Sequence, residues 1–279
     1  MKNILKSFFI TLFPTVTLWV FVSTIIDLST EFFRLNTLGN FISSVTILLF
    51  FARLFLKSTA RTSVYLAPFS MSIGIGFILN LIPSNTENGI TLLFNSSLLT
   101  SWLLYLFWYS TFGIRKSKQL EIGKKLPEFS LEDTSKNRVN SYSFLGKTTV
   151  YIFYRGNWCP LCMAQIKEIA ASYKALELRG VKVFLVSPQS ERQSQKLAKQ
   201  FDAPMTFMVD KNLKAAKQLG IMHESGTPVG MKGYDSDTVM PTAILTDKTG
   251  KIIFADLTDN YRVRPEPKTF INILDNQPT

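Results

Sequence analysis

Four stretches of apolar residues fill most of the first 118 residues, and they constrain the fold more than any other feature. Each is close to the ~20 residues that a helix needs to cross ~30 Å of hydrocarbon. Arg53 is the one charge within them, and it lies about a turn from the end of its segment, where its side chain can reach the interface. Long helices of a soluble bundle should show a polar face, which these lack. We therefore expect four transmembrane helices, at residues 8–26, 38–56, 64–82 and 90–112.

The rest of the chain has the composition of an ordinary soluble domain. The last 161 residues contain 22 Lys and Arg against 17 Asp and Glu, whereas the first 118 contain 9 and 3. The net charge of +11 raises the question of nucleic-acid binding, but the chain shows no basic stripe interleaved with aromatic residues. We therefore expect a membrane half and a soluble half, and no nucleic-acid partner.

The positive charges follow a pattern that orients the four helices. Lys and Arg gather before the first helix, around the second loop and after the fourth helix, at Lys2, Lys6, Arg53, Lys57, Arg61, Arg115, Lys116 and Lys118. The first loop has one basic residue, Arg34, against Asp27 and Glu31, and the third has Glu87 alone. Because cytoplasmic loops are enriched in Lys and Arg, we predict that both termini and the soluble half are cytoplasmic. The expected location is the cell inner membrane, and a different number of spanning helices would reverse the orientation.

From about residue 126 the pattern changes to alternating strands and helices. Strands are predicted at 149–154, 181–186, 205–209, 242–246 and 252–255, and helices at 162–176, 191–201 and 213–219. The strand–helix–strand start requires a parallel pair, while Asp247–Gly250 is a turn sequence suited to an antiparallel hairpin. We predict a mixed sheet between helices over residues 126–279, joined to the transmembrane region (1–114) by a polar linker at 115–125.

Both cysteines of the chain, Cys159 and Cys162, lie in the sequence Trp-Cys-Pro-Leu-Cys between a buried strand and a helix. A spacing of three residues across a helix start brings two sulfurs to one side. Free backbone N–H groups and the helix dipole stabilise a thiolate there. Pro160 fits the first helical position, because its missing N–H has no intrahelical partner there. We therefore expect Cys159 to be the nucleophilic thiolate and Cys162 to be the better shielded resolving thiol.

Three alternatives to a redox-active dithiol stay open for the two cysteines. A structural disulfide is disfavoured in a reducing compartment. A metal is the second alternative: a zinc site would need four ligands, and a copper site could combine the two thiols with the single histidine, His223. The third alternative is that the two cysteines are buried at this spacing and take part in no reaction.

Taken together, these residues resemble the thioredoxin fold. More specifically, they resemble the redoxin group that includes peroxiredoxins of the alkyl hydroperoxide reductase/thiol-specific antioxidant (AhpC/TSA) type. The motifs of the resemblance are Leu126–Leu131, Phe144–Lys147, Phe153–Cys162, Val183–Ser187, Ala203–Asp210, Pro241–Asp247 and Gly250–Lys251. The resemblance covers about residues 119–275 and none of the membrane half. It implies an α/β thioredoxin-like fold with a mixed central sheet.

The resemblance to thioredoxin-like proteins implies a role for each residue around the pair. Cys159 would be the attacking sulfur and Cys162 the resolver. Pro241 would be the cis-proline that faces the disulfide, and the exposed backbone at Met240 would pair with a bound polypeptide. Trp158 would shield the sulfur and offer a contact surface.

The resemblance to peroxiredoxins implies a different assignment. Counting from Phe153, Cys162 would be the peroxidatic cysteine, and Cys159 would replace the expected threonine or serine. Arg155 would replace the expected proline, and Met240 the expected arginine. Arg155 could supply a positive charge near either sulfur.

The resulting functional hypothesis is a membrane-anchored thiol–disulfide oxidoreductase of the AhpC/TSA redoxin type that uses the Cys-Pro-Leu-Cys dithiol. It needs no cofactor or metal. Its partners would be a disulfide or peroxide substrate, an external thiol reductant and the lipid bilayer. The alternative is a thiol-dependent peroxidase with an antioxidant role. Two further hypotheses are a metal-handling module and a non-catalytic docking protein.

Overall fold

The computed structural model describes residues 2–30, 34–82, 89–201 and 203–276, and the chain forms two compact units. The first unit contains Met1–Lys57 and Thr62–Thr111, and the second contains Ser58–Arg61 and Phe112–Thr279. Ser58–Arg61 therefore belongs with the C-terminal unit, although its neighbours on both sides in the sequence belong to the first. The sequence did not predict that this segment belongs to the second unit.

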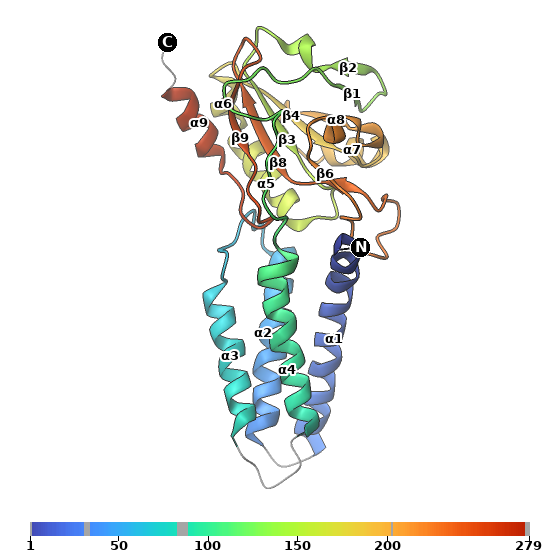
Figure 1. Ribbon diagram of the computed structural model, residues 1–279, viewed down its shortest axis with the longest axis vertical. Helices are drawn as coiled ribbons and strands as arrows, with labels where there is room; N and C mark the ends of the chain where they lie inside the picture. The colour runs from blue at the N-terminus through green and yellow to red at the C-terminus, as the bar shows by residue number, and fades with distance from the viewer. Residues whose placement is uncertain (1, 31–33, 83–88, 202, 277–279) are drawn as a thin grey trace. The chain divides into compact units, whose positions relative to one another are not determined.

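The first unit is a bundle of apolar helices (Figure 1). Its elements are α1 (Lys2–Thr30), α2 (Leu35–Leu56), α3 (Ala67–Leu81), α4 (Gly89–Leu104) and the π-helical turn η1 (Tyr105–Tyr109). The helices pack through aromatic rings, and the Phe50 ring lies 5.2 Å from the Trp102 ring and 5.5 Å from the Tyr105 ring. At one close crossing, a Cβ on Gly76 would lie 2.6 Å from the backbone oxygen of Gly39. Only glycine lets α2 and α3 approach this closely.

Three helices of this bundle are long and apolar enough to cross a membrane: Lys2–Ser29, Leu35–Leu56 and Gly89–Tyr109. The third predicted span, 64–82, is instead the 15-residue helix α3, about 22 Å long at 1.5 Å per residue. It starts late because Leu66 adopts a left-handed conformation just before it. Large apolar side chains lie exposed on the outside of the bundle, among them Leu12, Trp19, Leu49, Met71, Leu93 and Phe107. Such a surface is typical of contact with lipid. Glu31 and Glu87, which support the predicted orientation, lie outside the described residues.

The second unit is built on a seven-stranded sheet in the order β2-β1-β5-β4-β3-β8-β9 (Figure 1). Its strands are β1 (Ser130–Asp133), β2 (Arg138–Asn140), β3 (Thr149–Phe153), β4 (Lys182–Ser187), β5 (Thr206–Val209), β8 (Thr242–Thr246) and β9 (Ile252–Asp256). β3 pairs in parallel with β4, and β4 with β5, whereas β8 and β9 are antiparallel to their neighbours. The predicted mixed sheet is confirmed. All five residues of the central strand β3 are buried, as the continuous apolar run requires.

Helices and a small second sheet complete this unit. The elements are α5 (Pro160–Ala171), α6 (Tyr173–Glu177), α7 (Glu191–Ala198), α8 (Lys214–Gln218), α9 (Pro267–Asp275), the 3-10 turns η2 (Ser141–Phe144) and η3 (Lys211–Leu213), β6 (Met222–His223) and β7 (Thr238–Val239). The helix predicted at 162–176 is two helices, α5 and α6, which meet at Ser172. The edge strand β9 contacts α9, where the rings of Phe254 and Phe270 lie 5.9 Å apart.

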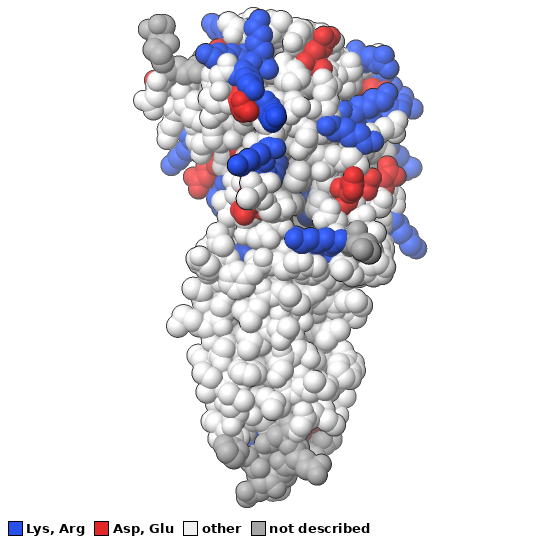
Figure 2. Space-filling model, viewed as in Figure 1, with Lys and Arg blue, Asp and Glu red and all other residues white. Residues whose placement is uncertain are grey.

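The segment predicted as a linker, residues 115–125, is part of the folded second unit. The Arg115 guanidinium donates to the backbone oxygens of Pro241 and Thr258, at 2.9 and 3.0 Å. Leu120 is buried in the core, and Lys125 forms a β-bridge with Lys251. The linker prediction is therefore wrong, because polar residues here pair with backbone groups of the sheet. On the face in Figure 2, charged side chains gather on the second unit, while the helices of the first present almost only uncharged atoms.

Candidate active site

The two cysteines lie where the central strand passes into helix α5. Cys159 is the N-cap of α5, Pro160 is among its first residues, and Cys162 follows in the first turn. Both thiols are free, and their Sγ atoms lie 2.7 Å apart. The Cys159 residue is 2% exposed and Cys162 is 1% exposed. The predicted juxtaposition at a helix start is confirmed, and a short approach of the two sulfurs would form the ~2.05 Å bond.

A residue that the sequence did not reveal, Arg264, lies against both sulfurs. Its Nη1 donates to Cys162 Sγ at 3.4 Å, and its Nη2 donates to Cys159 Sγ at 3.8 Å. The side chain is held by Gln165 Oε1, at 3.1 Å from Nη1, and by the Tyr261 carbonyl, at 3.0 Å from Nε. Arg264 is 5% exposed and lies between β9 and α9. No element was predicted from the sequence beyond residue 255, and no local signal there indicated this role.

This arrangement gives the two thiols very different acidities. Burial raises the pKa of Cys159 well above its ordinary value, and its hydrogen bond with Cys162 raises it further. Burial also raises the pKa of Cys162, but four interactions outweigh it and bring that pKa to about 5. They are the hydrogen bond with Cys159, the charge of Arg264, and hydrogen bonds from the backbone N–H of Arg155 and from the Arg264 side chain. This arrangement favours the thiolate on Cys162, which differs from the expectation that Cys159 ionises first.

Arg155 and Trp158 pack against each other in the loop before α5. The Arg155 guanidinium lies over the Trp158 ring, 4.7 Å from its centroid, and donates to the Gly226 carbonyl. The Arg155 carbonyl accepts a hydrogen bond from Thr238 Oγ1 at 2.9 Å. Gly156 between them has φ +150°, and a Cβ there would lie 2.7 Å from Trp158 Nε1. The predicted positive charge near the sulfurs is present at Arg155, and Trp158 packs on that arginine.

Met240 and Pro241 do not have the geometry that the resemblance implied. The Met240–Pro241 bond is trans, since the described residues contain no cis peptide. The Met240 N–H donates to the Ile221 carbonyl at 2.8 Å, and the Met240 carbonyl accepts from Thr242 Oγ1 at 2.8 Å. The prediction of a cis-proline beside a backbone free for a bound polypeptide is wrong, because these polar groups already pair within the domain.

The metal-site alternative finds no support in the described part of the chain. Within those residues, no group of three or more His, Cys, Asp and Glu side chains could hold a metal ion. His223 lies in β6, with its ring edge-on to Phe112 at 5.2 Å. The two cysteines and His223 therefore do not form a three-ligand copper site.

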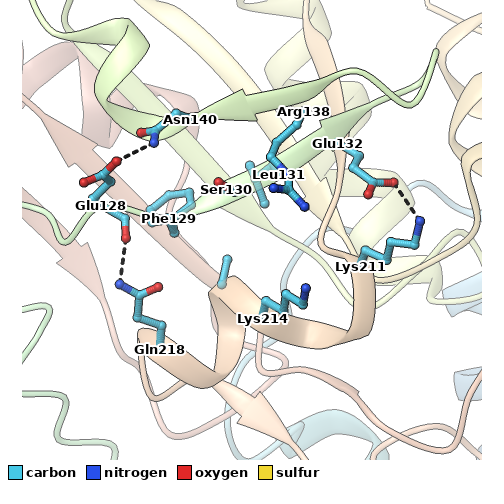
Figure 3. Close-up of a pocket in the computed structure, with 11 residues that line it drawn as sticks. Glu128, Phe129, Ser130, Leu131, Glu132, Arg138, Asn140, Lys211, Lys214 and Gln218 are labelled. Carbon is cyan, nitrogen blue, oxygen red and sulfur yellow. Dashed lines mark hydrogen bonds and ion pairs between the residues drawn. The ribbon is translucent and has the colours of Figure 1, made fainter.

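The cavities differ in their relation to the cysteines. A cavity of about 370 Å³ between β1, β2 and α8 (Figure 3) is lined mainly by polar residues, with an ion pair between Lys211 Nζ and Glu132 Oε2 at 3.3 Å. The cysteines are not among its lining residues. A cavity of about 190 Å³ has Arg155 in its wall, together with Gln189, Thr227, Tyr234 and Asp237, among others. This second cavity adjoins the loop before α5 through Arg155.

Fold and site together define a thioredoxin-like domain with a thiolate-containing dithiol at a helix start. Residues 122–255 match the AhpC/TSA family. The thiol-disulfide oxidoreductase ResA of Bacillus thuringiensis subsp. konkukian (strain 97-27) is 25% identical over 139 residues, which cover 50% of this chain and 70% of that protein. The putative peroxiredoxin bcp of Haemophilus influenzae is 22% identical over 155 residues, covering 56% of this chain and 96% of that one. These similarities are consistent with a redoxin-type oxidoreductase activity of the second unit.

Solved structures show similarity over the same part of the chain. Peroxidoxin BcpB from Mycobacterium tuberculosis aligns with a TM-score of 0.47 and 17% identity, over 57% of this chain and 99% of that one. A peroxiredoxin-like protein from Aquifex aeolicus aligns with a TM-score of 0.48 and 16% identity, over 56% and 87%.

Proposed function

We propose that this protein is a membrane-anchored thiol–disulfide oxidoreductase in which Cys162 is the nucleophile and Cys159 the resolving thiol. The observation that supports this assignment most directly is the contact of the Arg264 guanidinium with Cys162 Sγ. A buried thiolate needs a cation beside it. Arg264 supplies that cation, and the pKa of Cys162, about 5, keeps the sulfur ionised at neutral pH.

The reaction proceeds in two exchange steps. The Cys162 thiolate attacks one sulfur of a substrate disulfide, forms a mixed disulfide and expels the other substrate sulfur as a thiolate. Cys159 then loses its proton to the expelled thiolate and attacks Cys162 Sγ, which lies 2.7 Å away in the reduced pair. The products are the Cys159–Cys162 disulfide and a substrate reduced by two electrons: one substrate sulfur takes the Cys159 proton, and the other leaves Cys162 as a thiolate that takes its proton from water. An external dithiol reverses these steps and restores the pair.

A second candidate, thiol peroxidase, is favoured by the burial of the sulfurs. Cys159 and Cys162 are 2% and 1% exposed, so a hydroperoxide reaches them with less opening of the domain than a protein disulfide requires. The Cys162 thiolate would attack the terminal peroxide oxygen, giving a sulfenic acid and an alcohol or water. Cys159 would condense with the sulfenic acid, giving the disulfide and water. The same external reductant would close the cycle.

One experiment tests the proposed function and separates its two candidates. The full chain in detergent receives either insulin with a thiol reductant or hydrogen peroxide, alongside Cys159→Ser and Cys162→Ser. We expect Cys162→Ser to abolish turnover, and Cys159→Ser to stop at a mixed disulfide or a sulfenic acid. Substrate reduction that survives Cys162→Ser would overturn the assignment. The substrate that is turned over identifies the reaction.

The membrane part of the proposal concerns anchoring and orientation. Three helices of sufficient length and apolarity support anchoring. The distribution of Lys and Arg supports cytoplasmic termini if α3 also spans. We propose that the redoxin domain faces the cytoplasm from the inner membrane. A periplasm-dependent reporter fused after Thr279 should be inactive, and activity there would mean that an odd number of helices crosses.

A further inference from the structure

Arg61 makes contacts that connect it to the thiolate site. It lies in Ser58–Arg61, the short segment between α2 and α3 that belongs to the second unit. Its Nε donates to the Arg264 carbonyl at 3.2 Å, and its Nη2 donates to the Pro265 carbonyl at 3.4 Å. These are the backbone groups of the residue that contacts both sulfurs and of the residue that follows it.

The same guanidinium also binds helix α5, which begins at the cysteines. Arg61 Nη1 donates to Glu168 Oε1 at 3.2 Å, and Nη2 donates to Glu168 Oε2. Glu168 lies in α5, less than two turns beyond Cys162. A planar guanidinium with five N–H donors can make such a paired contact with a carboxylate and still reach two carbonyls, which a lysine cannot.

We infer that Arg61 is a positioning residue for the thiolate: it fixes the backbone of Arg264 relative to helix α5 and so sets the distance between the Arg264 guanidinium and Cys162 Sγ. The inference rests on the proposed function, because it concerns the thiolate which that function uses. It also goes further, because both arginines lie outside the segment that matches the AhpC/TSA family, residues 122–255. The acidity of the site therefore depends on a segment between two apolar helices.

The physical reason is the steep dependence of a charge interaction on distance inside a protein. The Arg264 guanidinium and Cys162 Sγ are 3.4 Å apart and both are buried, so water screens their attraction little. Without Arg61, the segment before α9 loses its attachment to α5 at the Arg264 carbonyl. When this segment is less constrained, the Arg264 guanidinium lies farther from Cys162 Sγ. The pKa of Cys162 then rises.

The test measures the pKa of the thiolate in the reduced full chain, from the pH dependence of thiolate absorbance and of alkylation rate. We expect Arg61→Gln to raise this pKa by about one unit, which is about a tenfold change in the ionisation equilibrium. Glu168→Gln should raise it less, since Arg61 keeps its contacts with the two carbonyls. An unfolding midpoint for each variant verifies that the domain is folded.

A matched control and a double variant make the result specific. Arg179 forms a paired contact of the same kind with Asp275 in α9, at 2.7 and 2.9 Å, so Arg179→Gln should leave the thiolate pKa unchanged. In an Arg264→Met background, Arg61→Gln should have no further effect. An unchanged pKa in Arg61→Gln, or an equal shift with and without Arg264, would overturn the inference. Neither result depends on turnover, so the proposed function would stand.

Discussion

Replacing Arg264 by methionine should make the dithiol a stronger reductant. The thiolate on Cys162 exists only in the reduced protein, so the charge of Arg264 stabilises the reduced form relative to the disulfide. The pKa of Cys162 is about 5. At pH 7 this ionisation stabilises the reduced form by roughly 3 kcal/mol. For a two-electron couple that is about 60 mV of reduction potential.

Methionine keeps the apolar part of the side chain and removes the charge. Loss of this charge and of its hydrogen bond raises the pKa of Cys162, so the stabilisation of the reduced form is weakened. We expect the reduction potential at pH 7 to fall by up to about 60 mV. Equilibration in buffers of reduced and oxidised dithiothreitol, followed by thiol trapping and mass spectrometry, measures this shift in the full chain.

The pH dependence of the potential gives an independent measurement. Between pH 5 and the higher pKa of Cys159, reduction of the wild-type disulfide takes up one proton, so the potential should fall by about 30 mV per pH unit. In Arg264→Met the pKa of Cys162 is higher, so the slope near neutrality should steepen toward about 59 mV per unit, the value for uptake of two protons. Arg179→Gln serves as the control. A variant with the wild-type slope, or with a higher potential at pH 7, would show that Arg264 does not hold the thiolate.

The remaining predictions concern reactivity and local stability. At pH 6.5, iodoacetamide should alkylate reduced Cys159→Ser at least about tenfold faster than Cys162→Ser, because the thiolate is the reactive form; equal rates would contradict the assignment to Cys162. Gly156→Ala should lower the free energy of unfolding by roughly 1–3 kcal/mol, since the new Cβ meets Trp158 Nε1; an unchanged denaturant midpoint would contradict this. Asp247→Ala should lower it by about 1 kcal/mol, because Asp247 Oδ1 accepts hydrogen bonds from the hairpin turn. Burial raises the pKa of Asp247, but these bonds lower it overall, so their contribution should be present above pH ~4 and lost in stronger acid.

Two features of the site favour different cysteines as the nucleophile. Position at the helix start favoured Cys159, because the N-cap residue lies closest to the free N–H groups and the positive end of the dipole. In the folded domain, a full positive charge lies 3.4 Å from Cys162 Sγ and 3.8 Å from Cys159 Sγ. A guanidinium with its N–H groups directed at the sulfur outweighs the partial charge of a helix end, which is about half an elementary charge. The cation and the hydrogen bond with Cys159 together favour ionisation of Cys162.

The sequence by itself determined the features that depend on local pattern. Apolar runs fixed the helices of the first unit, continuous β-branched and aromatic runs such as Thr149–Phe153 fixed the strands, and Cys-Pro-Leu-Cys fixed a dithiol at the start of α5. These features follow from side-chain periodicity and backbone preference, which act over a few neighbouring residues.

The tertiary structure alone decided the electrostatics of the site. Arg264 lies 102 residues from Cys162 in the sequence and contacts it only in the folded chain. Arg61 lies 203 residues from Arg264 and contacts its carbonyl only there. The same holds for Met240, whose backbone is already paired with Ile221. Charge interactions and hydrogen bonds depend on distances of a few ångströms between atoms, and no local pattern in the sequence specifies those distances.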